Sequence, residues 1–159
     1  MNQLKSIAIK TTSRADMQTL QSAEITVAKG ITGDFRGSQV DRQVTILSES
    51  SWQKACEAVN TDLPWTIRRV NLLIDGVEFS AADFGKTIRI GDAELKITRE
   101  TNPCARMDQQ HQGLTAALTP DWRGGVCCNV VTAGKIRIDD QVEIAPSPPG
   151  GEGRDEGVL

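Results

Sequence analysis

The sequence has no run of apolar residues close to the roughly 20 that a membrane-spanning helix needs. Its N-terminus has no apolar segment behind a basic start, so we expect no secretory signal and a cytoplasmic location. The net charge is −3, whereas general nucleic-acid binders are usually basic. We therefore expect neither a membrane nor a nucleic acid among the partners of this protein.

Common metal and nucleotide motifs are also missing. No CxxC pair and no Cys/His spacing typical of structural zinc is present. The glycine-rich stretch 30–37 lacks the Lys-Ser or Lys-Thr ending of a nucleotide P-loop and does not match a dinucleotide fingerprint. The single histidine, His111, lies in a glutamine-rich run, where a solvated surface role is the commoner one. Without an export signal, the four cysteines are expected to be reduced thiols.

The length of 159 residues predicts one domain with a real hydrophobic core. Hydrophobic residues make up 38% and charged residues 25%, an ordinary globular balance. From residue 146 onward proline, glycine and charged residues dominate, and such a segment cannot bury apolar area. We predict a single domain over residues 1–145 and a disordered tail over residues 146–159.

Short alternating or apolar runs, separated by turn residues, indicate about nine strands. Hairpins are expected at Asp75-Gly76, Gly91-Asp92 and Asp139-Asp140, while 11–21 reads as a loop. The predicted fold class is mostly β (α+β), with strands closed into a barrel and a few short helices. The strand-like runs are 4–9, 23–29, 43–47, 69–75, 77–79, 86–90, 93–98, 126–132, 135–138 and 141–144.

The clearest helix covers residues 48–60, with Ser48 as its expected cap. Apolar residues at 52, 55, 56 and 59 share one face, so Cys56 is predicted to be an inert core residue. Pro64 can open a turn or short helix up to Arg68. Residues 103–110 and 107–118 are weakly helical. Cys127 and Cys128 lie on a strand, so their side chains should point to opposite faces.

Cys104 is the residue around which a function can be built. It follows the strand 93–97 and the turn Thr98-Arg99-Glu100-Thr101-Asn102-Pro103, and Pro103 is expected to open a short helix. A thiol at a helix start, with Arg99 and Arg106 nearby in sequence, is in an environment that favours the thiolate. A thiolate serves as nucleophile, redox centre or soft-metal ligand, whereas the alternative is a packed, buried thiol.

Arginine outnumbers lysine by 11 to 7. Because the planar guanidinium suits phosphate and carboxylate, several arginines beside turns favour an anionic small ligand over plain surface solvation. The arginines in question are Arg36, Arg42, Arg68, Arg69, Arg99, Arg106 and Arg123. We expect roughly half of them to be surface or structural residues.

An ordered set of landmarks resembles the MOSC domain, named for the C-terminal domain of molybdenum-cofactor sulfurases. The resemblance covers roughly residues 6–144. The landmarks are Gly30-Ile31-Thr32-Gly33-Asp34, Arg42-Gln43-Val44-Thr45-Ile46-Leu47, Arg68-Arg69-Val70-Asn71-Leu72, Gly91-Asp92-Ala93, Thr101-Asn102-Pro103-Cys104, Arg123-Gly124-Gly125-Val126 and Gly134-Lys135-Ile136-Arg137 with Asp140.

This resemblance implies a barrel-centred fold and a site for the molybdenum cofactor (molybdopterin), a pterin dithiolene that carries a phosphate. It also implies that Cys104 is the catalytic residue and the metal ligand, and it brings pyridoxal phosphate binding as a further expectation. Arginines and glycine-loop N–H groups would hold the phosphate, and neutral side chains would bond the pterin. The expected cofactor-binding residues are Gly33, Asp34, Arg36, Arg42, Arg68, Arg69, Asn71, Arg99, Thr101, Arg106 and Arg123.

Stand-alone bacterial members resemble reductases of N-hydroxylated compounds, so a molybdenum oxidoreductase acting on such substrates is the first hypothesis. The second is a sulfur-carrier or cofactor-delivery module with a persulfide on Cys104. The third is a binding module in which Cys104 is merely packed. The expected partners are a small-molecule cofactor and substrate, together with a separate electron-donor protein or a desulfurase.

Overall fold

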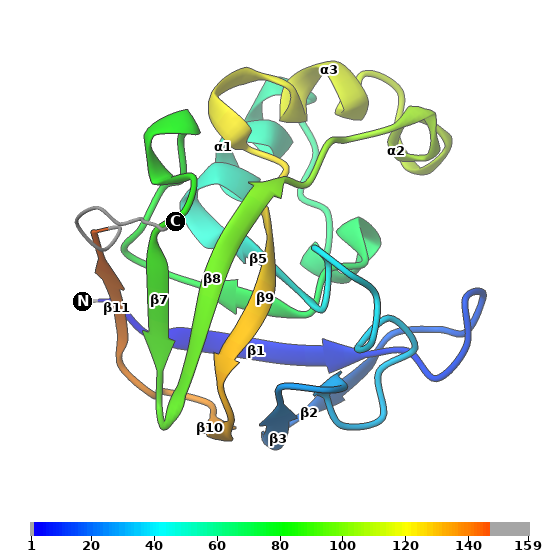
Figure 1. Cartoon of the computed structure of the whole chain (residues 1–159). Coiled ribbons are helices and arrows are strands. Elements are labelled where there is room, and N and C mark those ends of the chain that lie inside the picture. Colours follow the sequence, from blue (N-terminus) through cyan, green and yellow to red (C-terminus); the bar gives the residue numbers. More distant parts are fainter. Residues whose placement is uncertain (1, 147–159) are drawn as a thin grey trace.

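The structure, a computed structural model, describes residues 2–146, so the predicted disordered tail lies outside the described residues from position 147 on. Eight strands form the main sheet, and only the β5–β6 pair is parallel (Figure 1). In spatial order these strands are β11 (Val142–Ala145), β7 (Thr87–Ile90), β8 (Ala93–Glu100), β9 (Val126–Thr132), β5 (Val44–Ser48), β6 (Leu72–Ile74), β1 (Leu4–Ile9) and β2 (Gln18–Leu20). A second sheet holds β10 (Gly134–Arg137), β3 (Ser22–Thr26) and β4 (Gly30–Ile31).

The prediction of a mostly β, mixed α+β fold is confirmed, but the predicted closed barrel is not. Within residues 2–146 the ladders end at β11 on one side and β2 on the other. An isolated bridge joins Gln3 to Gln141, and the N–H groups of Leu4 and Val142 donate to the carbonyls of Asp140 and Asn2. The start of β1 therefore touches the start of β11 without forming a continuous ladder.

Most predicted strands are present, and two predicted hairpins are wrong. Residues 77–79 form no strand, because β6 already has β1 on one side and β5 on the other. The turn at Asp139-Asp140 does not return the chain to its neighbour, since β10 pairs with β3 and β11 pairs with β7. Only the hairpin at Gly91-Asp92 forms, between β7 and β8. The short edge strand β2 lies inside the expected loop 11–21.

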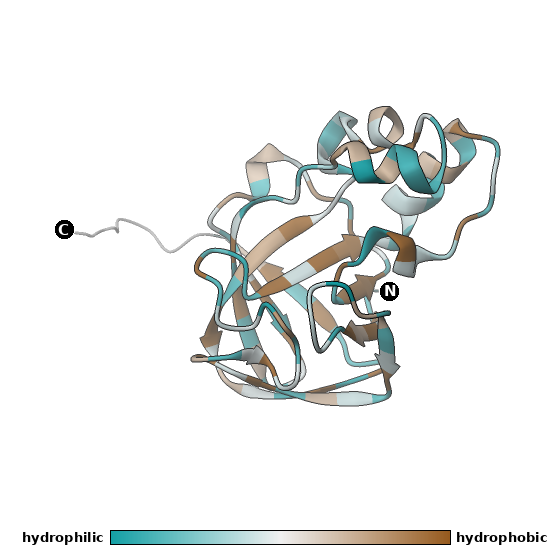
Figure 2. Cartoon of the chain, turned by 90° about the vertical axis from the view of Figure 1, so that its right-hand side faces the viewer, coloured by the Kyte–Doolittle hydropathy of each residue, from teal (hydrophilic) through white to brown (hydrophobic). Residues whose placement is uncertain are grey.

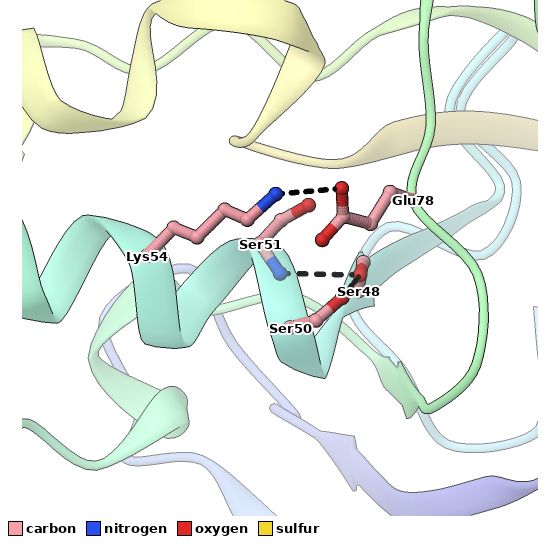
Figure 3. A network of polar contacts seen from close by, with 5 residues as sticks. All are labelled: Ser48, Ser50, Ser51, Lys54 and Glu78. Atoms are coloured by element: carbon pink, nitrogen blue, oxygen red, sulfur yellow. Dashed lines mark hydrogen bonds and ion pairs between the residues drawn. The ribbon is translucent and has the colours of Figure 1, made fainter.

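The three α-helices gather beyond one end of the main sheet, at the top of Figure 1. The hydroxyl of Ser48 accepts from the N–H of Ser51 at 3.3 Å, which confirms the predicted cap, and Lys54 pairs with Glu78 beside it at 2.9 Å (Figure 3). No helix in the described part of the chain is both long and apolar enough to cross a membrane. The helices are α1 (Glu49–Ala58), η1 (Trp65–Arg68), η2 (Ala81–Asp83), α2 (Ala105–Gln110), α3 (Leu114–Leu118) and η3 (Pro120–Trp122).

Two hydrophobic cores result. The larger packs apolar residues from strands of both sheets, and the smaller lies between the helices and the main sheet. Figure 2 shows brown, apolar colour concentrated on the strands, whereas teal, white and brown alternate on the helices and loops around them. Cys56 lies in the smaller core, as predicted, and Cys128 in the larger. Cys127 is buried as well, so both faces of β9 are covered at these two cysteines.

A buried network of hydrogen bonds around the Asn71 side chain connects β5, β6 and β1. The amide oxygen of Asn71 accepts from the N–H and the hydroxyl of Thr45, at 3.0 and 3.1 Å. Its Nδ2 donates to the carbonyl of Ala8 at 3.1 Å. The side chain at the entry to β6 thus bonds both β5 and β1, in addition to the backbone bonds from the Asn71 N–H to the Thr45 carbonyl and from the Ala8 N–H to the Asn71 carbonyl.

Replacing Asn71 with alanine should destabilise the fold by about 3 kcal/mol, because buried groups of Thr45 and Ala8 lose their partner. Asn129→Ala is the matched control, since the Oδ1 of Asn129 is buried without a partner, and it should cost below about 1 kcal/mol. Urea unfolding followed by tryptophan fluorescence measures both. Equal losses for the two variants would contradict the structural role given to Asn71.

Candidate functional site

A cleft of about 420 Å³ contains Cys104 and most of the predicted arginines. Its walls come from the loop after β1, the loop after β4, the end of η1 and the segment from β8 into α2. Figure 1 shows α2 and the loop after β1 on the same, right-hand side of the molecule. The lining residues are Lys10, Ser13, Arg14, Arg36, Arg42, Arg68, Arg69, Asn102, Cys104, Arg106 and Met107.

Seven of these lining residues are cationic, and none is acidic. In the described part of the chain, every ion pair within 4.0 Å involves side chains outside the cleft. Although the net charge of the whole protein is −3, the cleft concentrates positive charge, and the rest of the protein is acidic. Cleft walls of one sign focus the field and attract ions of the opposite sign, so this arrangement suits an anionic ligand.

The cations differ in depth. Lys10 and Arg68 are only 6% exposed, whereas Arg14 and Arg106 are exposed at the mouth. Arg36, Arg42 and Arg69 are half-buried between them. A small inner cavity shares Lys10, Arg36, Arg42 and Arg69 with the cleft.

Two guanidinium nitrogens in this inner region have no partner. The Nε atoms of Arg36 and Arg42 are buried and make no hydrogen bond to any described residue. A buried donor without an acceptor costs about 1–3 kcal/mol, so two of them on residues that line the same cavity favour an anionic ligand there.

Burial and mutual repulsion act on the charges of the cleft. Burial lowers the pKa of Lys10 to about 8, with Arg36 and Arg69 adding to the effect and Asp34 opposing it. Burial also lowers the pKa of Arg68 to about 10 and lowers that of Arg42. Burial is the first cause of all three shifts, and an anion bound in the cleft would act in the opposite direction.

Arg68 fastens the two loops beside Cys104. Its Nη2 donates to the carbonyl of Thr101 at 2.8 Å, and its Nε donates to the carbonyl of Gly124 at 3.1 Å. A Cβ at Gly124 would lie 2.6 Å from the Thr101 oxygen and 3.0 Å from Arg68, so glycine is needed for this close approach. We call these two bonds the Arg68 clamp.

Cys104 itself is exposed, so the hypothesis of a packed thiol is wrong. Helix α2 begins at Ala105, with Cys104 as its cap residue in extended conformation, so Pro103 does not open the helix as predicted. The carbonyl of Cys104 accepts from the hydroxyl of Thr115 at 2.8 Å. The backbone is therefore held on both sides of the thiol while the side chain faces the cleft.

The remaining predicted site residues are not in the lining of the cleft, although Asn71 and Asp34 line the inner cavity. Asn71 and Thr101 are buried with their side chains bonded to protein groups, and Arg123 donates to the carbonyl of Ala117. Arg99 is exposed outside the cleft.

Asp34 and Gly33 shape the loop after β4. The carboxylate of Asp34 accepts from the N–H groups of Lys10 and Arg36, at 3.1 and 3.2 Å, and lines the inner cavity. Gly33 turns the chain with a φ of +90°. Asp34 thus ties the backbone of Lys10 to the backbone of Arg36.

Five lining residues were missed from the sequence. Lys10 directly follows the buried strand β1, and a charged residue in that position is the one signal that could have drawn attention to it. The others carry no such signal. The missed residues are Lys10, Ser13, Arg14, Asn102 and Met107.

A thiol-reactive aromatic disulfide should label one cysteine rapidly in the native protein, because Cys104 is exposed while Cys56, Cys127 and Cys128 are at most 5% exposed. In denaturant, four thiols should react. Cys104→Ser should abolish the fast phase and leave three thiols after unfolding. A fast phase that persists in this variant would show that another cysteine is accessible.

Solved structures show the same fold. The YuaD protein of Bacillus subtilis matches with a TM-score of 0.75 and 16% identity, over 93% of this chain and 98% of that one. YiiM of Geobacillus stearothermophilus matches with a TM-score of 0.75 and 14% identity, over 96% and 79%. YiiM of Escherichia coli matches with a TM-score of 0.68 and 16% identity, over 92% and 71%.

A search of curated proteins returns no match. The family model described as "MOSC domain" matches residues 25–143, which is well over half of the sequence and includes Cys104 with most of the cationic cleft. The chain therefore belongs to the MOSC domain family.

Proposed function

We propose that residues 1–145 act as one unit that binds the molybdenum cofactor in the cationic cleft and reduces N-hydroxylated compounds, with Cys104 as the thiolate ligand of molybdenum. The observation that carries this proposal is the exposed thiol of Cys104 in a cleft with seven cations and no acidic side chain. The family is associated with this cofactor. The residues of the cleft fit both its phosphate and its metal.

The inner end fits the phosphate. A phosphate monoester carries about −1.5 to −2 charges at pH 7 and several strong acceptor oxygens. Arg36 and Arg42 offer buried Nε donors without partners, and Lys10 and Arg69 add positive charge in the same inner region. Arginine forks bind phosphate oxygens in pairs, so these four residues would hold the phosphate.

The other end fits a metal that brings its own ligands. In the part of the chain that the structure describes, no three His, Cys, Asp or Glu side chains cluster around a metal position. A single thiolate from Cys104 is therefore what this protein can add to a metal already held by dithiolene sulfur, and thiolate is a soft ligand of the right kind. When bound, the cofactor supplies a metal that takes up the oxygen of an N–O bond.

The residues of this chain bind the cofactor and fix the position of the Cys104 thiol. The Arg68 clamp and the Thr115 hydroxyl fix the backbone around Cys104, which limits where its sulfur can lie. Reduction of N–OH to N–H and water consumes two electrons and two protons, and we assign the electrons to a separate donor protein. The four residues of the inner region hold the anionic end in place while the N–O bond is reduced at the Cys104 end.

The alternative is a persulfide carried on Cys104, which needs the same thiol. It leaves the unpartnered nitrogens of Arg36 and Arg42 without an acceptor, and this observation favours the cofactor. Intact mass after incubation with a cysteine desulfurase separates the two functions. One added sulfur atom that a thiol reductant removes, in protein that acquires no pterin, would support the carrier.

Protein from a cofactor-competent host should contain molybdenum and pterin in about equal amounts. Cys104→Ala should lose most of the molybdenum, and Arg36→Met/Arg42→Met should lose both components because the phosphate is no longer held. Lys135→Met/Arg137→Met removes two exposed cations outside the cleft and serves as the matched control. Equal metal in the wild type and Cys104→Ala would remove Cys104 as a ligand.

Sulfate binding to the cofactor-free protein should depend on Lys10. Its pKa of about 8 in the free protein rises when a dianion binds, so affinity is greatest below that pH and falls as the amine deprotonates above it. Between about pH 7 and 9.5 we expect about a tenfold loss by titration calorimetry.

Two variants test this assignment. Lys10→Arg keeps a positive charge at both pH values, so its affinity should stay high and flat. Lys10→Met should be weak and flat. A wild-type profile without a step, or the same step in Lys10→Arg, would show that another group titrates.

A further inference from the structure

Two arginines at the mouth of the cleft are not explained by cofactor binding. Arg14 comes from the loop after β1, and Arg106 comes from α2, so they approach the cleft from separate segments. Both are exposed, and neither side chain has a hydrogen bond or an ion pair with a residue in the range 2–146.

Both segments are nevertheless held. The Nη2 of Arg69 donates to the carbonyl of Ala15 at 2.5 Å, which fixes the loop next to Arg14. The Thr115 hydroxyl fixes the carbonyl of Cys104, two residues before Arg106. The backbone next to each of these two arginines is thus anchored beside the cleft that both arginines line.

The phosphate of the cofactor does not need the charges of Arg14 and Arg106. Lys10, Arg36, Arg42 and Arg69 already exceed the roughly two negative charges of a phosphate monoester. Arg68 donates two hydrogen bonds to the backbone carbonyls of Thr101 and Gly124. Placing two more cations beside five others raises their mutual repulsion, and a second anion at the mouth would relieve it.

We propose that Arg14 and Arg106 form a second anion subsite that selects substrates carrying a carboxylate or phosphate group. This inference rests on the proposed function, because it concerns the molecule that is reduced beside Cys104. Arg14 and Arg106 hold the acid group at the mouth, with Asn102 and Ser13 as neutral donors.

The rest of the substrate then extends toward Cys104. The side chain of Met107 is 4% exposed and lines the same cleft, so it offers an apolar contact to the uncharged body of the substrate. An acid group held at one end and an apolar contact behind it orient the N–OH group inward. A neutral N-hydroxylated compound has only the apolar contact.

Three probes of one shape test the selection: benzamidoxime, 4-carboxybenzamidoxime and 4-phosphonobenzamidoxime, with reduced methyl viologen as the electron donor. The cofactor-loaded wild type should show a KM at least about tenfold lower for the acidic probes than for benzamidoxime, and similar kcat values. The carboxylate and phosphonate arms show which acid group is preferred.

In Arg14→Met/Arg106→Met the KM for the acidic probes should rise to that for benzamidoxime, whose own KM should change less than about twofold. Lys135→Met/Arg137→Met removes the same number of cations outside the cleft and should keep the preference. An unchanged preference in the mouth variant, or no preference in the wild type, would overturn the proposal.

A binding measurement keeps the two proposals separate. Calorimetry with the reduced products should show that 4-carboxybenzamidine or 4-phosphonobenzamidine binds the loaded wild type more tightly than benzamidine, and that the mouth variant loses this difference. If no probe is reduced although molybdenum is present, the reductase function fails and this binding result alone decides on the subsite. Equal binding of acidic and neutral products would overturn the subsite.

Discussion

The Arg68 clamp is the interaction on which the site depends. One buried guanidinium bonds the carbonyls of Thr101 and Gly124, and thereby joins the segment that leads to Cys104 with the loop that leads into β9. Because both acceptors are backbone atoms, the clamp fixes the path of the chain rather than particular side chains. Without it the Cys104 wall of the cleft would be held to the sheet only through β8 itself, the bond from the Thr101 N–H to the Gly125 carbonyl and the contact of the Thr101 hydroxyl with Cys127.

The same residue shows how the cleft combines structure with electrostatics. Arg68 is buried and lines the cleft, so its charge acts on the cleft while its donors hold the walls. Lys10 also combines the two roles. Its backbone N–H donates to the carboxylate of Asp34, and its side chain lines the inner cavity. The positive field is therefore built from groups that also shape the cavity, which limits how far the cations can move apart to relieve their repulsion.

The sequence predicted the strand-rich fold, the cap at Ser48 and an arginine site around Cys104, because these depend on local pattern or on motifs in order. It did not predict the partners of β6, β10 and β11, since pairing depends on which strands meet in space. It did not reveal that the side chains of Asn71 and Thr101 bond buried backbone and thiol groups, nor that Asn71 at the same time lines the inner cavity. It missed Lys10 and Arg14, which join the site only because the loop after β1 folds over the cleft.

The bridge between Gln3 and Gln141 has a mechanical consequence. The two segments are antiparallel, and the bond from Val142 to Asn2 is the outermost one between them, while β11 stays paired with β7 up to Ala145. A force applied to both ends would therefore peel these bonds one after another instead of shearing them together. The force needed to separate the Gln3 and Gln141 segments should be low. The longer ladder between β8 and β9 should stay intact when extension begins.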